Sequence, residues 1–115
     1  MKREFGSQGE EIAARYLQEQ GYKILQRNYH TQYGEVDIVC SSGQTIVFVE
    51  VKTRANTSFG FPEEAVTKTK QEHIRKTALA YLQYAPHHYK EIRFDVIGIL
   101  FEETGFHINH LPAAF

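Results

Sequence analysis

The chain has 115 residues, a formal net charge of −1, 42% hydrophobic and 23% charged residues, and a single cysteine, Cys40. These values are ordinary for one small globular domain, exclude a disordered or low-complexity chain, and leave no internal disulfide framework. The polar N-terminus predicts no signal peptide, and no apolar run approaches the roughly 20 residues that span a bilayer, so we expect a cytoplasmic protein without membrane contact.

The predicted elements start with a helix from Gln8 to about Gln20, with Ser7 as its N-cap and Gly21 as its stop signal. A strand over 22–29 follows, and then two Val- and Ile-rich runs, 34–40 and 46–54, around a turn signal at 41–44. These runs predict an antiparallel β-hairpin.

The second half of the chain predicts a loop over 55–64, a long helix capped by Thr67 that ends near Tyr84, and strands over 92–101 and 106–111. The resulting order αβββαββ indicates an α/β sandwich built on a mixed sheet.

The hairpin carries charges where an apolar strand should have none, namely Glu35, Asp37, Glu50 and Lys52. Alternation along a strand places Glu35 and Asp37 on one face, and Glu50 and Lys52 on one face. Folding about the turn brings Asp37 opposite or diagonal to Glu50, roughly 5–8 Å apart. Carboxylates at that distance favour a cation such as Mg²⁺, Mn²⁺ or Ca²⁺. A register slip, or a purely structural buried ion-pair cluster, is the alternative.

Asp37 followed by Glu50-Val51-Lys52 resembles the PD-(D/E)xK nuclease superfamily, which includes restriction endonucleases and archaeal Holliday-junction resolvases, although Val36 replaces the usual proline. Nearly the whole chain resembles the YraN-like family of small bacterial predicted nucleases. That wider resemblance is carried by Gly9-Glu10, Ala13, Tyr16-Leu17, Gly21-Tyr22, Arg27-Asn28, Gly34 to Asp37, Phe48 to Arg54, Lys70, Arg93 to Asp95 and Ala114-Phe115.

The resemblance implies a restriction-endonuclease-like fold with the hairpin in the middle of the sheet. It implies that Asp37, Glu50 and the Val51 carbonyl ligate Mg²⁺ or Mn²⁺, which acts as a Lewis acid on the scissile phosphate. Lys52 would position the attacking water or stabilise the developing charge. Glu10 would bind a second metal or orient a ligand; its alternative is a solvated glutamate favoured by the helix dipole.

Further candidate residues have equally plain alternatives. Glu35 is a candidate ligand, or an acceptor that supports one, while Arg54 and Lys70 are candidate DNA phosphate contacts or simply exposed basic residues. Asp95 lies in an apolar strand, where pairing with Arg93 is the favoured explanation. The histidine pairs 87–88 and 107/110 lack the spacing and partners of a zinc site.

Three classes of function remain. The first is a metal-dependent endonuclease acting on DNA, with branched or single-stranded DNA as candidate substrates and a homodimer expected for a resolvase-like enzyme. The second is a non-catalytic nucleic-acid-binding module. The third is a protein-interaction domain, which a net charge of −1 permits, since proteins that grip phosphates usually carry a basic excess.

Overall fold

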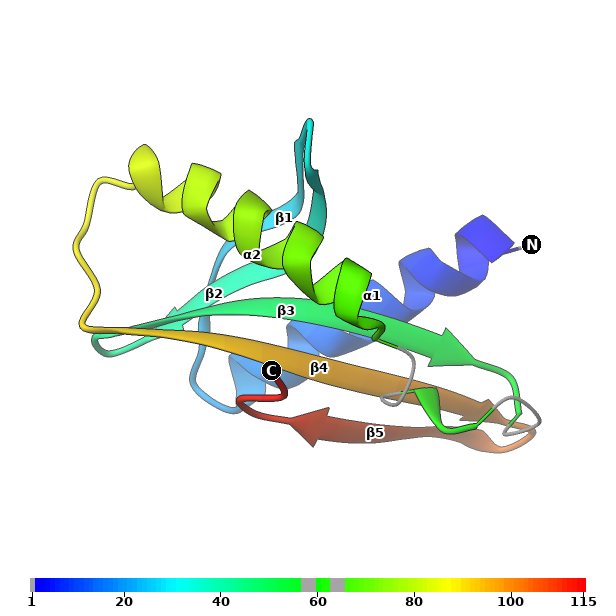
Figure 1. Ribbon diagram of the computed structural model, residues 1–115. Helices are drawn as coiled ribbons and strands as arrows, with labels where there is room; N and C mark the ends of the chain where they lie inside the picture. The colour runs from blue at the N-terminus through cyan, green and yellow to red at the C-terminus, as the bar shows by residue number, and fades with distance from the viewer. Residues whose placement is uncertain (1, 57–59, 63–65) are drawn as a thin grey trace.

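The computed structural model describes residues 2–56, 60–62 and 66–115, with the backbone alone for residues 2–5. The elements are α1 (Lys2–Glu19), β1 (Lys23–Thr31), β2 (Gly34–Ser42), β3 (Thr45–Arg54), α2 (Lys68–Gln83), β4 (Glu91–Glu102) and β5 (Gly105–Leu111). The strands form one sheet in sequential order, with α1 and α2 on opposite faces (Figure 1). The predicted mixed α/β fold and the order αβββαββ are therefore confirmed.

The sheet is mixed because β3 and β4 are parallel, whereas the other neighbouring strands are antiparallel. A parallel pair needs a long crossover connection, and α2 supplies it. The predicted hairpin is β2–β3, which pairs from Ser42↔Thr45 to Ile38↔Val49. β3 is the central strand, so the charges that the hairpin carries lie in the middle of the sheet.

The predicted second helix is confirmed together with its cap. The Thr67 side chain accepts a hydrogen bond from the Lys70 N–H at 3.2 Å, which satisfies one of the free donors of the first turn. Ile74 and Ala78 are buried on the inner side of α2, where they meet Phe48 of the central strand. The helix thus closes one face of the sheet.

The predicted start of the first helix is wrong. α1 begins at Lys2, and Ser7 lies exposed within it. No proline interrupts residues 2–8, so the helical hydrogen bonds continue through Ser7 instead of starting there. Further along, Ala13 and Leu17 are fully buried against the sheet, as the predicted apolar stripe requires.

Two apolar clusters form the core, one on each face of the sheet. The α1 side contains Ala13, Ala14, Leu17, Ile38, Cys40, Val47, Val49, Ile97 and Ile99. The α2 side contains Val36, Val39, Ile46, Phe48, Ile74, Ala78 and Phe94. A sheet covered on both faces explains why β3 and β4 are almost continuous apolar runs in the sequence.

Half of the loop predicted over 55–64, residues 57–59 and 63–64, lies outside the described residues. Within the described part of the chain, neither helix combines the length and the apolar character needed to cross a bilayer.

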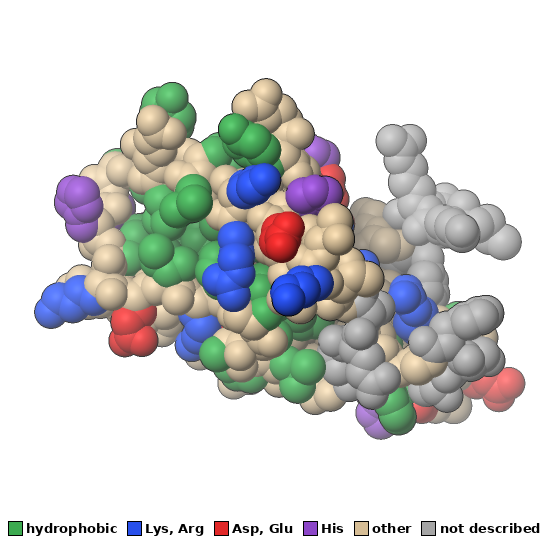
Figure 2. Space-filling view, viewed as in Figure 1, with side chains coloured by type: hydrophobic (Ala, Val, Ile, Leu, Met, Phe, Trp, Pro, Cys, Tyr) green, Lys and Arg blue, Asp and Glu red, His purple; other side chains and the backbone are tan. Residues whose placement is uncertain are grey.

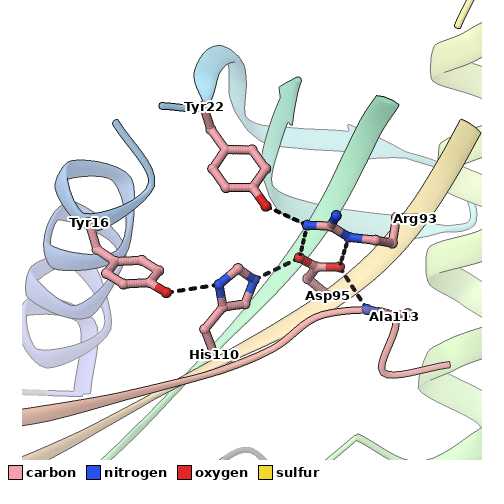
Figure 3. Close-up of polar contacts among 6 residues, drawn as sticks. All are labelled: Tyr16, Tyr22, Arg93, Asp95, His110 and Ala113. Carbon is pink, nitrogen blue, oxygen red and sulfur yellow. Dashed lines mark hydrogen bonds and ion pairs between the residues drawn. The ribbon is translucent and has the colours of Figure 1, made fainter. Parts of the chain in front are cut away.

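A buried polar network ties the C-terminal strand to the rest of the α1 face (Figure 3). Asp95 has no exposed surface, and its carboxylate accepts hydrogen bonds from Arg93 on both oxygens at 2.8 Å and from the Ala113 N–H at 3.0 Å. His110 of β5 bonds Asp95 at 2.7 Å through Nε2 and the Tyr16 hydroxyl at 3.0 Å through Nδ1. The predicted structural pairing of Arg93 with Asp95 is confirmed.

Candidate active site

The charged residues of the hairpin lie where β2 separates from β3. Pairing between these strands ends at Ile38↔Val49, whereas β1 and β2 stay paired out to Thr31↔Gly34. The free end of the β1–β2 hairpin therefore leaves the sheet and rises beside α2 (Figure 1). Asp37 and Glu50, one residue beyond the last pair on either strand, lie at this point, which we call the β2–β3 fork.

Strict alternation fails at the fork. Val36 packs in the α2-side cluster and Ile38 in the α1-side cluster, although residues two apart in a regular strand share a face. Across from them, Asn28 of β1 has a φ of +53°, a left-handed conformation that asparagine tolerates better than most residues. Because alternation is interrupted between Val36 and Ile38, the shared face of Glu35 and Asp37 does not follow from alternation alone and stays a prediction.

The fork gives Asp37 a backbone partner on β3. Its Oδ2 accepts a hydrogen bond from the Val51 N–H at 2.7 Å, in place of the strand carbonyl that β2 no longer supplies. Asp37 is 7% exposed and Glu50 is 3% exposed. Burial, and then a shared hydrogen bond and repulsion with Glu50, raise the pKa of Asp37 to about 9, although the Val51 N–H opposes the shift. Without a bound cation, two buried carboxyl groups this close favour a proton.

Two lysines converge on Glu50. Its Oε2 lies 3.7 Å from Nζ of Lys52, two residues along the same face of β3, and 3.3 Å from Nζ of Lys70 in the first turn of α2. Both lysines are largely but not fully covered. The predicted site residues Asp37, Glu50, Lys52 and Lys70 therefore form one cluster, with a solvent-accessible side made by the ammonium groups.

Glu10 reaches the edge of the same cluster from α1. Burial raises its pKa, the repulsion of Glu35 and Glu50 adds to that effect, and a hydrogen bond to Asn28 and the charge of Arg27 oppose it. The position of Glu10 depends on Gly9, because a Cβ on Gly9 would lie 2.3 Å from Oγ1 of Thr53 on β3. The helix approaches the central strand as closely as it does only because residue 9 has no side chain.

The remaining predicted residues have contacts of their own outside the carboxylate pair. Glu35 forms an ion pair with His30 at 3.1 Å, and its side chain is 37% exposed. Arg54 donates a hydrogen bond to the Thr53 carbonyl at 3.0 Å, at the end of β3. His30 therefore competes with a metal ion for the Glu35 carboxylate. Arg54 lies two residues beyond Lys52 on β3.

The cluster holds few acidic groups for a metal site. Among the described residues, no three His, Cys, Asp or Glu side chains gather closely enough to enclose a metal ion. Two carboxylates and the backbone carbonyl of Val51 are nevertheless a hard oxygen donor set. Mg²⁺ commonly keeps several waters and binds proteins through one or two carboxylates, so the donors at the fork fit this ion.

Sequence reasoning missed the residues that shape the fork. Asn28 is singled out only as part of the family resemblance, although asparagine adopts a positive φ more readily than most residues. The Thr31 and Thr77 hydroxyls lie 3.3 Å apart and join the β1–β2 turn to α2. No local pattern marks such a contact, because the two residues are 46 positions apart.

Comparison with known proteins gives one consistent result. Residues 9–99 match the model of the uncharacterised protein family UPF0102. A UPF0102 protein of Syntrophomonas wolfei is 55% identical over 115 residues, covering 100% of both chains. A UPF0102 protein of Nocardia farcinica is 45% identical over 99% of this chain and 91% of its own, and one of Dictyoglomus turgidum is 41% identical over 98% of each.

Proposed function

This chain belongs to the uncharacterised family UPF0102, the YraN-like family that its sequence resembles, and we propose that it is a metal-dependent endonuclease that hydrolyses DNA phosphodiester bonds. The observation that carries the proposal is the buried pair Asp37 and Glu50 at the β2–β3 fork, with two lysines against it. A pair of buried carboxyl groups is costly to stability, which favours a site for a cation over a structural ion pair.

Asp37 and Glu50 would hold Mg²⁺ or Mn²⁺ together with the Val51 carbonyl. In an antiparallel strand the N–H and C=O of one residue point to the same side. The Val51 carbonyl therefore faces the fork into which its N–H donates to Asp37. When bound, the metal supplies Lewis-acid activation of the phosphate and of a water molecule.

The lysines supply the remaining charge. Lys52 lies on the same face of β3 as Glu50 and would orient the attacking water or neutralise charge that develops on the phosphate. Lys70 would bind a phosphate oxygen of the substrate, releasing Glu50 from its present ion pair. Glu10, at the edge of the cluster, would orient the water or a second metal.

A second candidate function is a non-catalytic nucleic-acid-binding or protein-interaction module that retains this fold. The observation that favours it is the contact of both lysines with Glu50, since these contacts balance charge at the fork without a metal. The two functions differ in the effect of a divalent metal: the endonuclease needs it to cut DNA, whereas the non-catalytic module does not need it to bind.

The test is cleavage of labelled linear, single-stranded, flap and four-way-junction DNAs with Mg²⁺ or Mn²⁺. The wild type is compared with Glu50→Gln and Lys52→Ala, and the matched controls are Glu103→Gln and Lys90→Ala, both exposed and away from the fork. We expect metal-dependent cutting, slowed at least about 100-fold in both site variants and unchanged in the controls. Folded wild-type protein that binds DNA without cutting any substrate would favour the second function.

A further inference from the structure

A second feature lies on the α2 face, beside the fork. A shallow pocket of about 400 Å³ is lined by Tyr33, Lys76, Leu79, Ala80 and Gln83. Tyr33 is 44% exposed and Leu79 is 66% exposed, so the apolar wall of the pocket is open to solvent. In Figure 2 hydrophobic side chains on this face lie next to a group of Lys and Arg side chains.

Tyr33 is held in place by its own turn. Its N–H donates to Thr31 Oγ1 at 3.1 Å, and the same hydroxyl lies 3.3 Å from that of Thr77 on α2. A Cβ on the next residue, Gly34, would touch the His73 side chain at 3.4 Å, so the turn packs directly on the helix. The ring is therefore presented on a supported element, with the Lys76 ammonium 5.9 Å from its centroid.

Residues of α2 connect the pocket with the fork. Lys70 contacts Glu50, His73 packs against Gly34, and Lys76 borders Tyr33. Successive members are three residues apart, so each is a near neighbour of the next on the helix surface, along a row that winds gradually around α2. Six residues span roughly 9 Å of helix, the length of two or three stacked nucleotides at about 3.4 Å each.

We infer that the Tyr33 pocket receives an unpaired nucleobase of the DNA strand whose phosphate lies at Lys70 and Glu50. An exposed aromatic ring with a cation over it combines the two kinds of group that bind single strands, an aromatic surface for bases and a positive charge for the backbone. Leu79 and Ala80 provide the apolar wall of the pocket, and the Gln83 amide can bond a base edge. In a duplex the base faces are already stacked, so the pocket selects a substrate with a single-stranded segment next to the cut.

This inference rests on the proposed function for the position of the phosphate, yet stacking can be measured without cleavage. The chain has no tryptophan, so Tyr33→Trp introduces a single tryptophan at the pocket, which is excited selectively at wavelengths that tyrosine does not absorb. Tyr84→Trp is the matched control, since Tyr84 is 81% exposed at the end of the same helix and lines neither site. Oligodeoxythymidine is titrated into both proteins in the Glu50→Gln background, where the strand stays intact.

We expect the oligonucleotide to quench the fluorescence of the Tyr33→Trp protein and not that of the Tyr84→Trp protein, and a fully paired duplex to quench neither. In the otherwise wild-type chain, Tyr33→Ala should weaken binding of the same oligonucleotide about tenfold, Tyr33→Phe should retain it, and Tyr84→Ala should leave it unchanged. Quenching in the Tyr33→Trp protein, combined with a wild type that cuts no DNA, would support the base pocket while refuting the nuclease.

Three results would overturn the inference. One is metal-dependent cleavage that Tyr33→Ala leaves unaffected, with no quenching in the Tyr33→Trp protein, which would refute the pocket and leave the nuclease standing. Another is quenching at lower concentrations of the matching oligoribonucleotide than of the oligodeoxythymidine, which would refute DNA as the source of the base. The third is a change in the fluorescence of the Tyr33→Trp protein with protein concentration alone, which would assign the pocket to a second copy of the chain.

Discussion

Asp37 and Asp95 are both buried carboxyl groups of the sheet, yet their surroundings shift their pKa values in opposite directions. Burial raises the pKa of Asp37, and the neighbouring Glu50 raises it further. Burial also acts to raise the pKa of Asp95, but hydrogen bonds from His110, Arg93 and the Ala113 N–H outweigh it and lower the pKa below its ordinary value. One carboxyl group therefore lacks a sufficient cationic partner, while the other has several donors.

Replacing Asp37 by Asn is expected to stabilise the metal-free protein. The folded-state pKa of about 9 exceeds the ordinary 3.8, so the folded protein binds more protons than the unfolded chain between these values. Its unfolding free energy must then fall as pH rises through that window. At pH 8, Asp37→Asn should raise the unfolding free energy by about 1–3 kcal/mol, the usual cost of burying a polar group without full compensation. Thermal melts from pH 5 to 9 in chelator test this.

The matched control is Asp95→Asn, the same chemical change at the other buried carboxyl group. It should destabilise the protein by about 3 kcal/mol, because Arg93 loses a charged partner. The contribution of Asp95 is present above its ordinary pKa and is lost as pH falls through the lowered one. A less stable Asp37→Asn variant at pH 8 in chelator would contradict the assignment of a strained carboxyl pair.

At the scale of elements, two irregularities build the candidate site. β2 leaves β3 at Ile38, so Asp37 and Glu50 lie at a free strand end instead of inside a continuous ladder. α1 meets β3 through Gly9 and Thr53, which sets Glu10 beside Asn28. The site is therefore assembled from α1, β2, β3 and α2, with each element contributing one or two side chains.

Gly9→Ala is expected to push α1 away from β3. The added Cβ would lie 2.3 Å from Thr53 Oγ1, and this overpacking should cost about 1–3 kcal/mol. The measurement is the unfolding free energy in urea. Gly6→Ala is the matched control on the same helix, because a Cβ there meets nothing within 4 Å, and it should be neutral or slightly stabilising.

A second substitution identifies the contact. Thr53→Ala removes the hydroxyl that the new Cβ would meet, so Gly9→Ala should cost at least about 1 kcal/mol less in that background. Equal costs of Gly9→Ala in the two backgrounds would show that α1 does not approach β3 at this point.

At the scale of the whole molecule, the positions of a few lysines matter more for binding than the net charge. The net charge is only −1, but Lys52 and Lys70 lie at the fork and Lys76 lies at the Tyr33 pocket. The first two ammonium groups meet at Glu50, and the third is carried by α2 six residues beyond Lys70. Binding of a single strand should therefore depend on a few phosphate contacts and not on a broad basic surface.

The salt dependence of binding tests this distribution. Three phosphate contacts predict a slope of about −2 in a plot of log binding constant against log salt concentration for single-stranded DNA, and Lys70→Ala should reduce the slope by about 0.7. Lys90→Ala, exposed at the start of β4, should leave the slope unchanged. A slope near zero for the wild type would mean that phosphates do not contact this face.

The sequence by itself determined what depends on local periodicity and short-range chemistry. It predicted the order of elements, the β2–β3 hairpin, the Thr67 cap and the pairing of Arg93 with Asp95, because propensity, capping and close pairs are written within a few residues. It also singled out the charged residues of the hairpin, since charge in an apolar strand stands out without any knowledge of the fold.

Only the tertiary structure decided how these residues meet. The break in alternation at Asp37, the contact of Lys70 with Glu50 and the close approach at Gly9 join segments far apart in the chain. The Tyr33 pocket likewise needs a turn and a helix more than 40 residues apart. The physical reason is that side-chain direction at a strand end, and contact between distant elements, follow from packing and sheet twist, which no local pattern encodes.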